Sequence, residues 1–575
     1  MPTKYHLSLI LLIIALTLLV YYDSFNNSFV YDDYPFLVEN PAVRILTLRG
    51  IISNFIDRAA ASSSERLSKD VWRPFVTTSF AIDYRLWGLK PRFYHIENTA
   101  FHTMNAILVY CITFLILKDA LAAFIASLVF AIHPAETEAV TWVSGRSNVL
   151  FLLFFLLAFI FHIRDTGYKK SVLNRALSLV FFAFSLFSKE MAIALPLVLI
   201  LYDAHFHGRR SLKTYVNNYL PFFLVGAFYL IARFSVLGTI AQKEEWWGGG
   251  IFANILVTLK AVAEYIRILL FPVNLKIMYL VDAPKSLFER DILAALFIIF
   301  LAIFFYLANM RRKEASFYIL WFFITLIPVS NIVPFKAVMA ERFLYLPMIG
   351  FASCFGMIFS NAGSNPRLGT MSRAVLNFIF IAILIFYGAA TISRNCEWRD
   401  EITFYAQESI RSPKDPTAHY NLAFAYGKEA HRYADREEGI ADAYYGLAIK
   451  EYKEALSLKP DSQLAYAGLG NVYNELGFYD DGIKNFRKAS AIKEDSDIYN
   501  NMAVSYYRKG IFDETIKFCK KALYLKPGHA NAYINMGNAF YAKKEYGKAK
   551  LAWLEAGSGI SGADLLTDKR MKEAV

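Results

Sequence analysis

The chain has 575 residues, of which 56% are hydrophobic and only 19% are charged, whereas roughly 25% of the residues in a soluble globular domain are charged. This composition argues against a soluble enzyme. The formal net charge is +12, but the excess of Lys and Arg is not gathered in one block, so no nucleic-acid partner is expected. The four cysteines are widely spaced and indicate neither a zinc site nor a disulfide framework.

Residues 1–394 form a succession of apolar runs that predicts a polytopic helical membrane domain. The first run follows Lys4 and has no small-residue cleavage site after it, so we expect a retained anchor followed by a long outer loop over residues 22–97. The further predicted spans are 98–117, 121–140, 148–163, 176–189, 191–204, 219–237, 291–309, 316–329, 343–360 and 374–392. About eleven spans are therefore expected in total.

Two stretches leave alternatives open. Residues 251–272 are long enough to cross the bilayer but contain Lys260, Glu264 and Arg267, and each charge near a bilayer centre costs about 2.5 to 3.5 kcal/mol. Residues 176–202 could form one helix, or two short helices that meet at Lys189.

The positive-inside rule favours a non-spanning outer segment at about 239–290, two short helices at 176–202 and an outer C-terminal region. With that topology one face receives Lys4, Arg164, Lys169, Lys170, Arg175, Arg209, Arg210, Lys213, Arg311, Arg312, Lys313, Arg367 and Arg373.

Residues 395–575 contain an internal repeat. Tyr466, Tyr499 and Tyr533 stand 33 and 34 residues apart, and the small residues Gly470, Ala503 and Gly537 recur with the same spacing. This is the length and pattern of tetratricopeptide repeats, in which aromatic and aliphatic side chains interlock two antiparallel helices. The expected units are about 415–460, 463–495, 496–529 and 530–562. The predicted fold class is all-α: a membrane domain followed by an α-solenoid that binds a partner.

The predicted topology places many polar side chains on the same outer side of the membrane. They are Asp32, Asp33, Arg73, His95, His102, His133, Glu138, Arg146, Lys189, Glu190, Arg233, Glu341, Arg342 and Tyr345. Because such residues are costly near lipid, their convergence predicts a pocket at the outer membrane boundary. A carboxylate can take the proton of an attacking hydroxyl, and Arg and Lys can hold a phosphate. The combination suits transfer from a lipid-phosphate donor, although proton-coupled transporters gather similar residues.

Several strings resemble the transmembrane and tetratricopeptide repeat-containing (TMTC) O-mannosyltransferases of the C-type glycosyltransferase superfamily (GT-C). They begin with Phe29-Val30-Tyr31-Asp32-Asp33 and Glu39-Asn40-Pro41-Ala42-Val43. In chain order there follow Trp72-Arg73-Pro74, Tyr94-His95 with Asn98 and His102, His133-Pro134 with Thr137-Glu138-Ala139-Val140, Gly145-Arg146, Lys189-Glu190, Arg233 with Gly238, Phe271-Pro272 with Asn274-Leu275, Ala340-Glu341-Arg342 and Leu344-Tyr345-Leu346-Pro347. Their order over the membrane region, ending in repeats, makes the resemblance specific.

The resemblance implies an inverting transferase that moves a sugar, mannose in eukaryotic members, from a polyprenyl-phosphate carrier to Ser or Thr of an extracytoplasmic protein. Asp32 matches the general base, and Asp33 would support it or orient the acceptor. The candidates for the donor phosphate are Arg146, Lys189, Arg233 and Arg342, with Glu190 and Glu341 holding those cations. The other members of the predicted pocket are Arg73, His95, His102, His133, Glu138 and Tyr345.

No cofactor and no metal are predicted, although Asp32, Asp33 and Glu138 could ligate a divalent ion. The expected partners are the polyprenyl-phosphate-linked sugar, an acceptor protein bound by the repeats, and the bilayer. The expected setting is a prokaryotic cytoplasmic membrane with the repeats outside, or the endoplasmic reticulum membrane with lumenal repeats in a eukaryote. Two alternatives stay open: a non-enzymatic assembly or transport protein that binds partners through its repeats, and a GT-C enzyme that acts on a lipid or cell-surface glycan.

Overall fold

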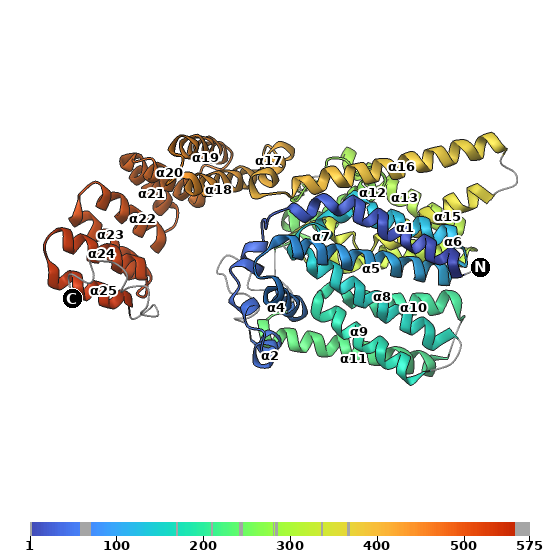
Figure 1. The fold of residues 1–575 in the computed structure, drawn as a ribbon. Coiled ribbons are helices and arrows are strands. Elements are labelled where there is room, and N and C mark those ends of the chain that lie inside the picture. The colour runs from blue at the N-terminus through green and yellow to red at the C-terminus, as the bar shows by residue number, and fades with distance from the viewer. Residues whose placement is uncertain are drawn as a thin grey trace. The chain divides into compact units, whose positions relative to one another are not determined.

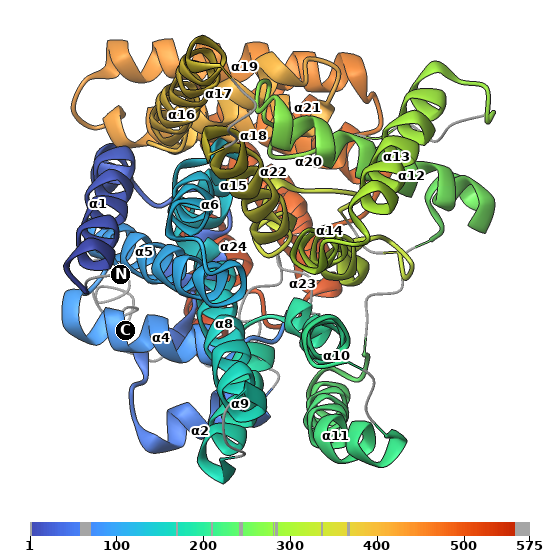
Figure 2. The ribbon, with the colours of Figure 1, turned by 90° about the vertical axis from the view of Figure 1, so that its right-hand side faces the viewer.

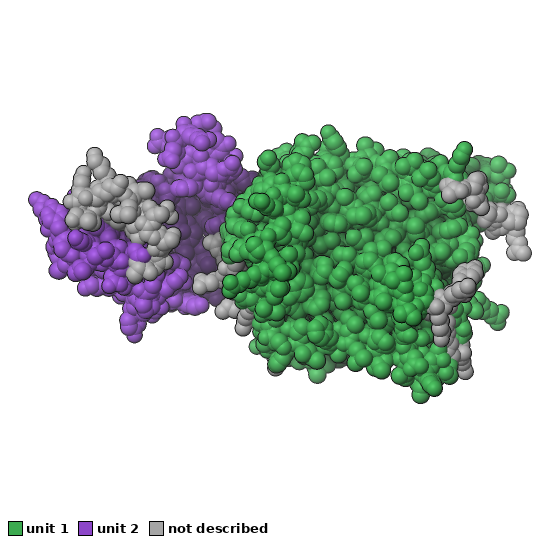
Figure 3. Space-filling model, turned by 60° about the horizontal axis from the view of Figure 1, so that its bottom comes forward, with its two compact units in different colours: residues 1–400 green, residues 401–575 purple. Residues whose placement is uncertain are grey.

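The computed structural model describes residues 3–57, 71–167, 171–208, 211–240, 245–279, 281, 286–334, 337–364 and 369–557, and this part of the chain contains helices and no strand. The predicted all-α fold is confirmed. The chain divides into two compact units, Met1–Asp400 and Glu401–Val575 (Figures 1 and 3). The division lies close to the predicted boundary at residues 394 and 395.

Unit 1 contains long helices joined by short helical turns. Its helices are α1 (Thr3–Tyr21), α2 (Leu48–Ile56), α4 (Pro74–Trp87), α5 (Pro91–Leu117), α6 (Ala120–Ile132), α7 (Thr137–Val140), α8 (Arg146–Gly167), α9 (Val172–Ser188), α10 (Leu195–Phe206), α11 (Leu212–Leu237), α12 (Ile251–Leu270), α13 (Arg290–Asn309), α14 (Lys313–Leu326), α15 (Met348–Ser364) and α16 (Thr370–Glu397). The helical turns are η1 (Tyr22–Asn26), η2 (Tyr34–Val38), η3 (Pro41–Arg44), η4 (Pro134–Glu136), η5 (Val143–Gly145), η6 (Glu190–Ala194), η7 (Trp247–Gly249), η8 (Ile327–Val329) and η9 (Glu341–Phe343).

Six helices of the described chain are long and apolar enough to cross a membrane, or seven if the bent pair Ala120–Ile132 and Pro134–Val140 is one span. They contain α1, α5, α8, α11, α13 and α16. The expected count of about eleven is higher because it includes apolar helices such as α9 and α15, which have 17 residues each. Helix α12, which carries the three charges discussed above, does not meet the same criterion. Lys169, Lys170, Arg209, Arg210 and Arg367 lie outside the described residues.

Residues 176–202 form two helices. Backbone φ and ψ angles of −161° and 138° at Lys189 end α9, and η6 then leads into α10. Lys189 is therefore held at a break between helices, where its side chain can reach across to other segments.

The interior of unit 1 is built around α5, α6, α8 and α15 (Figure 2). Aromatic rings fill it, for example Phe155 and Phe159 against Trp321. Close packing of α15 on α14 requires Gly350, because a Cβ atom there would stand 2.5 Å from the Tyr318 carbonyl oxygen. This packed core fixes the ends of the helices, and the polar segments described below connect those ends.

Unit 2 consists of α17 (Glu401–Arg411) and four helix pairs: α18 (Pro416–Tyr433) with α19 (Glu438–Leu458), α20 (Gln463–Glu475) with α21 (Tyr479–Ile492), α22 (Ser496–Arg508) with α23 (Phe512–Leu525), and α24 (Ala530–Ala542) with α25 (Tyr546–Gly557). Each pair falls within one predicted repeat, and residues 558–562 of the last repeat lie outside the described chain.

Aromatic packing joins the helices within a repeat of unit 2. A Cβ atom at Gly470 would stand 2.7 Å from Cε1 of Phe486, so the glycine allows the ring to lie on the helix backbone. Ion pairs then connect successive repeats, Lys509 with Asp480 and Lys543 with Asp513.

Candidate functional site

The loop that carries Asp32 and Asp33 follows a turn at Tyr31, whose φ of 56° lies in the left-handed region. Such backbone costs of order 1–3 kcal/mol for a residue other than glycine, and the surrounding structure must hold it. Asp33 supplies part of that support. Its carboxylate is fully buried and accepts hydrogen bonds from the backbone N–H of Val30 (3.1 Å) and of Ser144 (2.7 Å).

The two acids therefore differ in environment. Burial raises the pKa of Asp33 to about 7, although the bonds from Val30 and Ser144 oppose the shift. Asp32 is only half-buried, and its carbonyl oxygen accepts a hydrogen bond from Ser144 Oγ at 3.4 Å. Asp33 holds the loop from its buried side. This position agrees with the predicted role of supporting Asp32, but it does not agree with the role of orienting an acceptor.

Arg342 lies near the Asp32 loop, because its guanidinium packs on Trp142, whose ring contacts Tyr31. Glu138 holds Arg342 in place. One carboxylate oxygen of Glu138 pairs with Nη1 of Arg342, and the other accepts the backbone N–H of Arg342 at 2.8 Å. The guanidinium also lies 5.7 Å from the ring centre of Trp142. Burial lowers the pKa of Arg342, but Glu138, Tyr31 and Asp32 raise it more, so Arg342 stays charged.

Lys189 is a buried side-chain amino group between two rings. Its Nζ atom donates a hydrogen bond to Asn148 Oδ1 and lies 5.7 Å from the ring centre of Phe151 and 5.6 Å from that of Phe343. Burial and then the neighbouring cations Arg73 and Arg342 lower the pKa of Lys189 well below its usual range. An anion bound close to Lys189 would favour its charged form and so raise this lowered pKa.

Arg73 and Arg233 complete the positive side of the site. Arg73 Nη2 pairs with Glu190 Oε1 at 3.0 Å, and Nη1 donates to Ser147 Oγ at 3.3 Å. Arg233 donates through Nε to the Ile240 carbonyl oxygen at 3.0 Å. Although burial opposes it, Arg73 and Arg233 hold the pKa of Glu190 well below its usual range. We call Arg73, Lys189, Arg233 and Arg342 the cation group.

A small cavity opens beside this group. It is lined by Phe36, Val71, Arg73, Val76, Thr77, Phe80, Trp142, Ser144 and Ser147. Ser144 bonds both acids of the Asp32 loop, so the cavity borders that loop, and Arg73 brings the cation group to its wall. The cavity thus offers hydroxyl groups, a guanidinium and aromatic rings to a ligand.

Arg146 does not fit the predicted contact with phosphate. Its side chain is fully buried, pairs with Asp83 (2.7 Å) and Glu97 (3.3 Å), and bonds Asn98 through Nε. The guanidinium also lies over the ring of Phe80 at 5.2 Å. Arg146 therefore connects α4, α5 and α8 inside the unit and has no free donor surface for a ligand.

The predicted pocket residues His95, His102, His133 and Tyr345 are also buried. Tyr345 donates its hydroxyl proton to His102 Nδ1 (2.8 Å), and His102 Nε2 donates to the Ala131 carbonyl oxygen (3.0 Å). His133 Nε2 bonds the Leu269 carbonyl oxygen at 3.1 Å. These residues join helices beneath the site and do not line its cavity.

Glu341 does not hold Arg342 as expected. It pairs with Arg394 at 3.4 Å and accepts a hydrogen bond from the Tyr279 hydroxyl at 2.8 Å. The helical turn η9 sends adjacent side chains in different directions, so Glu341 and Arg342 have separate partners. Sequence reasoning missed Asn148, Trp142, Ser144, Ser147, Arg394, Asp83 and Glu97, none of which stands in a distinctive motif.

Asn395 joins the end of the last membrane helix to this face of unit 1. Its side chain donates to the Val20 carbonyl oxygen at 2.9 Å and accepts from Thr141 Oγ1 at 2.6 Å. Asn27 Nδ2 donates to the Asn395 carbonyl oxygen at 3.0 Å. The chain therefore leaves unit 1 on the face that carries the Asp32 loop.

The described residues contain no group of three or more His, Cys, Asp or Glu side chains that could hold a metal ion. Asp33 is engaged by two backbone N–H groups and Glu138 by Arg342. The positive charge beside Asp32 comes from side chains of the protein itself.

Comparison with known proteins agrees with the resemblance. Residues 496–529 match a family model described as tetratricopeptide repeat. The chain is 24% identical to human protein O-mannosyl-transferase TMTC3 over 573 residues, which cover 93% of this chain and 58% of the human protein. It is 28% identical to protein O-mannosyl-transferase F38B6.6 of Caenorhabditis elegans, over 73% of this chain and 60% of the relative. It is also 34% identical to mouse protein O-mannosyl-transferase TMTC1 over 198 residues, 32% of this chain and 21% of the relative.

The predicted similarity to TMTC O-mannosyltransferases is confirmed by these relatives. The chain spans less than two thirds of the length of the curated relatives it matches. Among solved structures, the crystal structure of MamA is 22% identical with a TM-score of 0.24, covering 28% of this chain and 85% of MamA.

Proposed function

We propose that this chain is a membrane glycosyltransferase that moves a hexose, such as mannose, from a polyprenyl-phosphate donor to a Ser or Thr hydroxyl of protein. The observation that carries the proposal is the packing of Arg342 on Trp142, a ring that contacts Tyr31 next to Asp32 and lines the cavity together with Arg73. Lys189 shares the Phe343 ring with Arg342. The likeness to proteins named O-mannosyl-transferases along most of the chain supports the same reaction class.

In the proposed reaction, Asp32 takes the proton of the acceptor hydroxyl as that oxygen attacks the anomeric carbon. The new bond joins the acceptor oxygen to the anomeric carbon, and the bond from that carbon to the phosphate oxygen breaks. A single displacement inverts the anomeric centre through an oxocarbenium-like state. The products are the glycosylated hydroxyl, the polyprenyl phosphate, and a proton that Asp32 returns to solvent.

The cation group stabilises the leaving phosphate. Arg342 offers a guanidinium that Glu138 and Trp142 hold in place, and Lys189 offers a poorly solvated ammonium. Preorganised charge of this kind acts where negative charge develops, so no general acid is required for a phosphate that leaves as a stable anion. Asp33 positions the Asp32 loop through Val30 and Ser144 and takes no proton from the acceptor.

The acceptor is a protein, which the solenoid of unit 2 would bind through its stacked helix pairs. The chain leaves unit 1 on the face that carries Asp32. In this proposal that face lies outside the cytoplasm, and the donor enters from the bilayer.

The test measures sugar transfer by the purified chain from a polyprenyl-phosphate hexose to a Ser/Thr peptide, with mass spectrometry of the product. Asp32→Asn should lower turnover by at least about a hundredfold, in the range for a lost general base, while donor binding is kept. Asp23→Asn is the matched control, because Asp23 is an exposed acid on the preceding turn η1. Full turnover of Asp32→Asn would remove Asp32 as the base.

Transfer to a lipid or glycan but not to the peptide would instead identify a different acceptor class. Donor binding without any new glycosidic bond, in wild type and variants alike, would favour the non-enzymatic assembly protein.

A further inference from the structure

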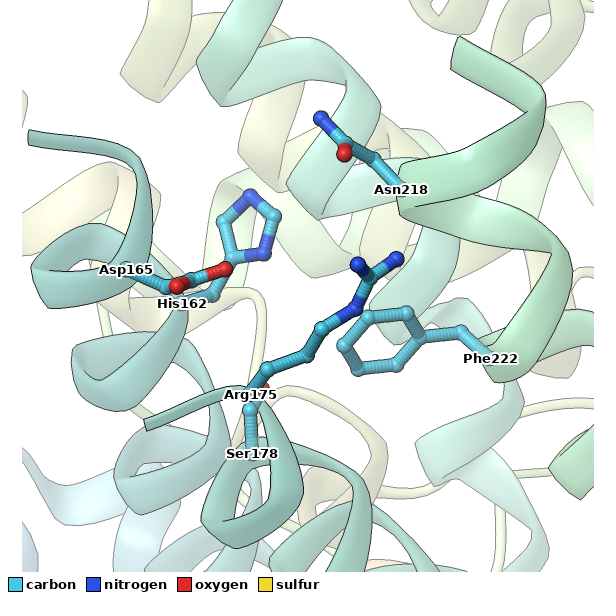
Figure 4. A pocket seen from close by; sticks show the side chains of 6 residues that line it. All are labelled: His162, Asp165, Arg175, Ser178, Asn218 and Phe222. Carbon is cyan, nitrogen blue, oxygen red and sulfur yellow. The ribbon is translucent and has the colours of Figure 1, made fainter. Parts of the chain in front are cut away.

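A second polar pocket lies at the other end of the hairpin formed by α8 and α9. Arg146 is the first residue of α8 and Lys189 follows the last residue of α9. Both residues therefore lie at the end of the hairpin that is near the candidate site. The second pocket is a narrow surface pocket lined by His162, Asp165, Arg175, Ser178, Asn218 and Phe222 (Figure 4). Neither the reaction proposed above nor its donor and acceptor uses these residues.

The lining carries both signs of charge. In Figure 4 the Arg175 side chain extends toward Asn218 and the Phe222 ring, while His162 and Asp165 stand on the other side of the pocket. Asp165 is held in place because its Oδ1 accepts a hydrogen bond from the backbone N–H of Ser171 at 2.7 Å. Nη2 of Arg175 donates to the Asn217 carbonyl oxygen. The pocket therefore presents the remaining N–H groups of Arg175, an amide and a fixed carboxylate to one ligand.

A buried carboxylate stands behind His162. Asp203 is fully buried, and its Oδ1 atom lies 3.5 Å from His162 Nε2 and 3.1 Å from His207 Nδ1. The Tyr219 hydroxyl donates to Asp203 Oδ2 at 2.6 Å. Because a buried polar group needs hydrogen-bond partners, Asp203 holds the His162 ring at the wall of the pocket, where an imidazole N–H can serve as a donor.

The depth of the pocket corresponds to a lipid headgroup. Asp165 lies in the last turn of α8, and Arg175 lies in the first turn of α9. Each of these residues stands only two or three positions from the end of its helix. At a rise of 1.5 Å per residue, both helix ends therefore lie within roughly 10 Å of the pocket. Helices α8 and α11 are long and apolar enough to cross the membrane, so their ends reach the boundary between hydrocarbon and headgroups.

We propose that this pocket binds the phosphoethanolamine headgroup of a phospholipid in the leaflet opposite to Asp32. The phosphate contacts Arg175, with His162 and the Asn218 amide as further donors, and the primary ammonium contacts Asp165. A primary ammonium can donate hydrogen bonds to a carboxylate, whereas the trimethylated ammonium of phosphocholine cannot. The proposal does not depend on the glycosyltransferase activity.

The test uses the full chain in phosphatidylcholine nanodiscs with photoactivatable phosphatidylethanolamine or phosphatidylcholine added in equal amounts. Labelled peptides from α8, α9 and α11 are quantified by mass spectrometry. The ethanolamine lipid should label them about tenfold more, the effect of one charge-assisted hydrogen bond. Excess inorganic phosphate should not displace the lipid, which separates a headgroup site from a site for a free anion.

Two variants test the two halves of the headgroup. Arg175→Gln should lower labelling by the ethanolamine lipid about tenfold, and Asp165→Asn should remove the preference over phosphatidylcholine. Lys213→Gln, which changes an exposed cation near the same end of α11, should leave both unchanged. Arg175→Lys, which keeps the charge without the fork, should give intermediate labelling if Arg175→Gln fails to fold.

Equal labelling by the two lipids, or an unchanged preference in Asp165→Asn, would overturn the proposal. Stronger labelling by phosphatidylglycerol than by phosphatidylethanolamine, or displacement by inorganic phosphate, would also overturn it, because either result describes a simple anion site.

Discussion

The two units use charged side chains in opposite ways. In unit 1, Arg146 has no exposed side-chain surface and pairs with Asp83, whose side chain is 6% exposed. In unit 2, Lys509 pairs with Asp480, whose side chain is 84% exposed. The first pair connects helices far apart in sequence, whereas the second recurs between neighbouring repeats as Lys543 with Asp513.

The difference teaches where each unit obtains its stability. A buried charge that loses its partner leaves an uncompensated ion in a poorly solvated interior, whereas an exposed pair is screened by water. Unit 1 depends on buried ion pairs such as Arg146 with Asp83 and Arg342 with Glu138, and the second of these shapes its candidate site. Unit 2 depends on aromatic packing repeated along the solenoid, and its ion pairs add little.

The largest effect is expected at Arg146. Arg146→Gln leaves the buried Asp83 carboxylate without its cation and should lower the free energy of unfolding of unit 1 by about 3–5 kcal/mol. Thermal unfolding of the purified chain in detergent measures the change. Arg399→Gln is the control, since the Arg399 side chain is 68% exposed and should be nearly neutral. A stable Arg146→Gln protein that has lost donor affinity would restore the phosphate-binding role predicted from the sequence.

In unit 2 the larger loss should come from packing. Gly470→Ala introduces a Cβ atom 2.7 Å from Phe486 Cε1 and should destabilise the α20–α21 pair by about 1–3 kcal/mol. Hydrogen exchange of the full chain follows the local opening of these helices. Gly446→Ala within α19 meets no atom within 4 Å and should stabilise that helix by about 0.5–1 kcal/mol. Equal effects of both substitutions would contradict the packing argument.

Lys189 provides a pH test of the buried network. Burial favours the neutral amine, and a bound phosphate favours the ammonium, so donor binding should take up a proton. Affinity for polyprenyl phosphate should therefore fall as pH rises above the lowered pKa of Lys189, by up to about tenfold per pH unit. Calorimetry in buffers of different ionisation enthalpy counts the protons.

Lys189→Arg is the matched control, because a guanidinium stays protonated over the same pH range. This variant should bind without proton uptake and with a flatter pH profile. The same slope in both proteins would assign the titration to another group.

The smallest effect is expected at the exposed pairs. Lys509→Ala should cost less than about 1 kcal/mol, and salt should reduce even that difference. A double-mutant cycle with Asp480→Ala in the full chain isolates the pair from the rest of the repeat. A coupling as large as that of the buried Arg146 pair would erase the contrast between the units.

Unit 2 could be predicted from the sequence because each of its contacts lies within one or two repeats. The spacing of Tyr466, Tyr499 and Tyr533 already located the helix pairs. In unit 1 the cost of burying charge near lipid predicted that Asp32, Lys189 and Arg342 share one region, and in the structure Lys189 and Arg342 both pack on the Phe343 ring. Membrane topology restricts which residues can meet even when no motif connects them.

The partners of individual charges could not be predicted. Arg146 pairs with Asp83, which is 63 residues away in the sequence, and with Glu97, which is 49 residues away. No local sequence pattern predicts either contact. Glu341 stands beside Arg342 in the sequence, yet Glu138 holds Arg342 and Glu341 pairs with Arg394. Which charged side chains pair in a helical membrane unit depends on the rotation of each helix about its axis and on short turns such as η9. Neither can be predicted from the spacing of residues in the sequence alone.

The fastening of the Asp32 loop to Asn395 has a mechanical consequence. Asn27 and Ser28 bond the carbonyl oxygens of Asn395 and Arg399, one at each end of the last turn before Glu401. Tension on the tether between the units would therefore reach the strand of chain that bears the carboxylate through two hydrogen bonds. If the proposed acceptor binds unit 2, a pull on that unit would load these two bonds.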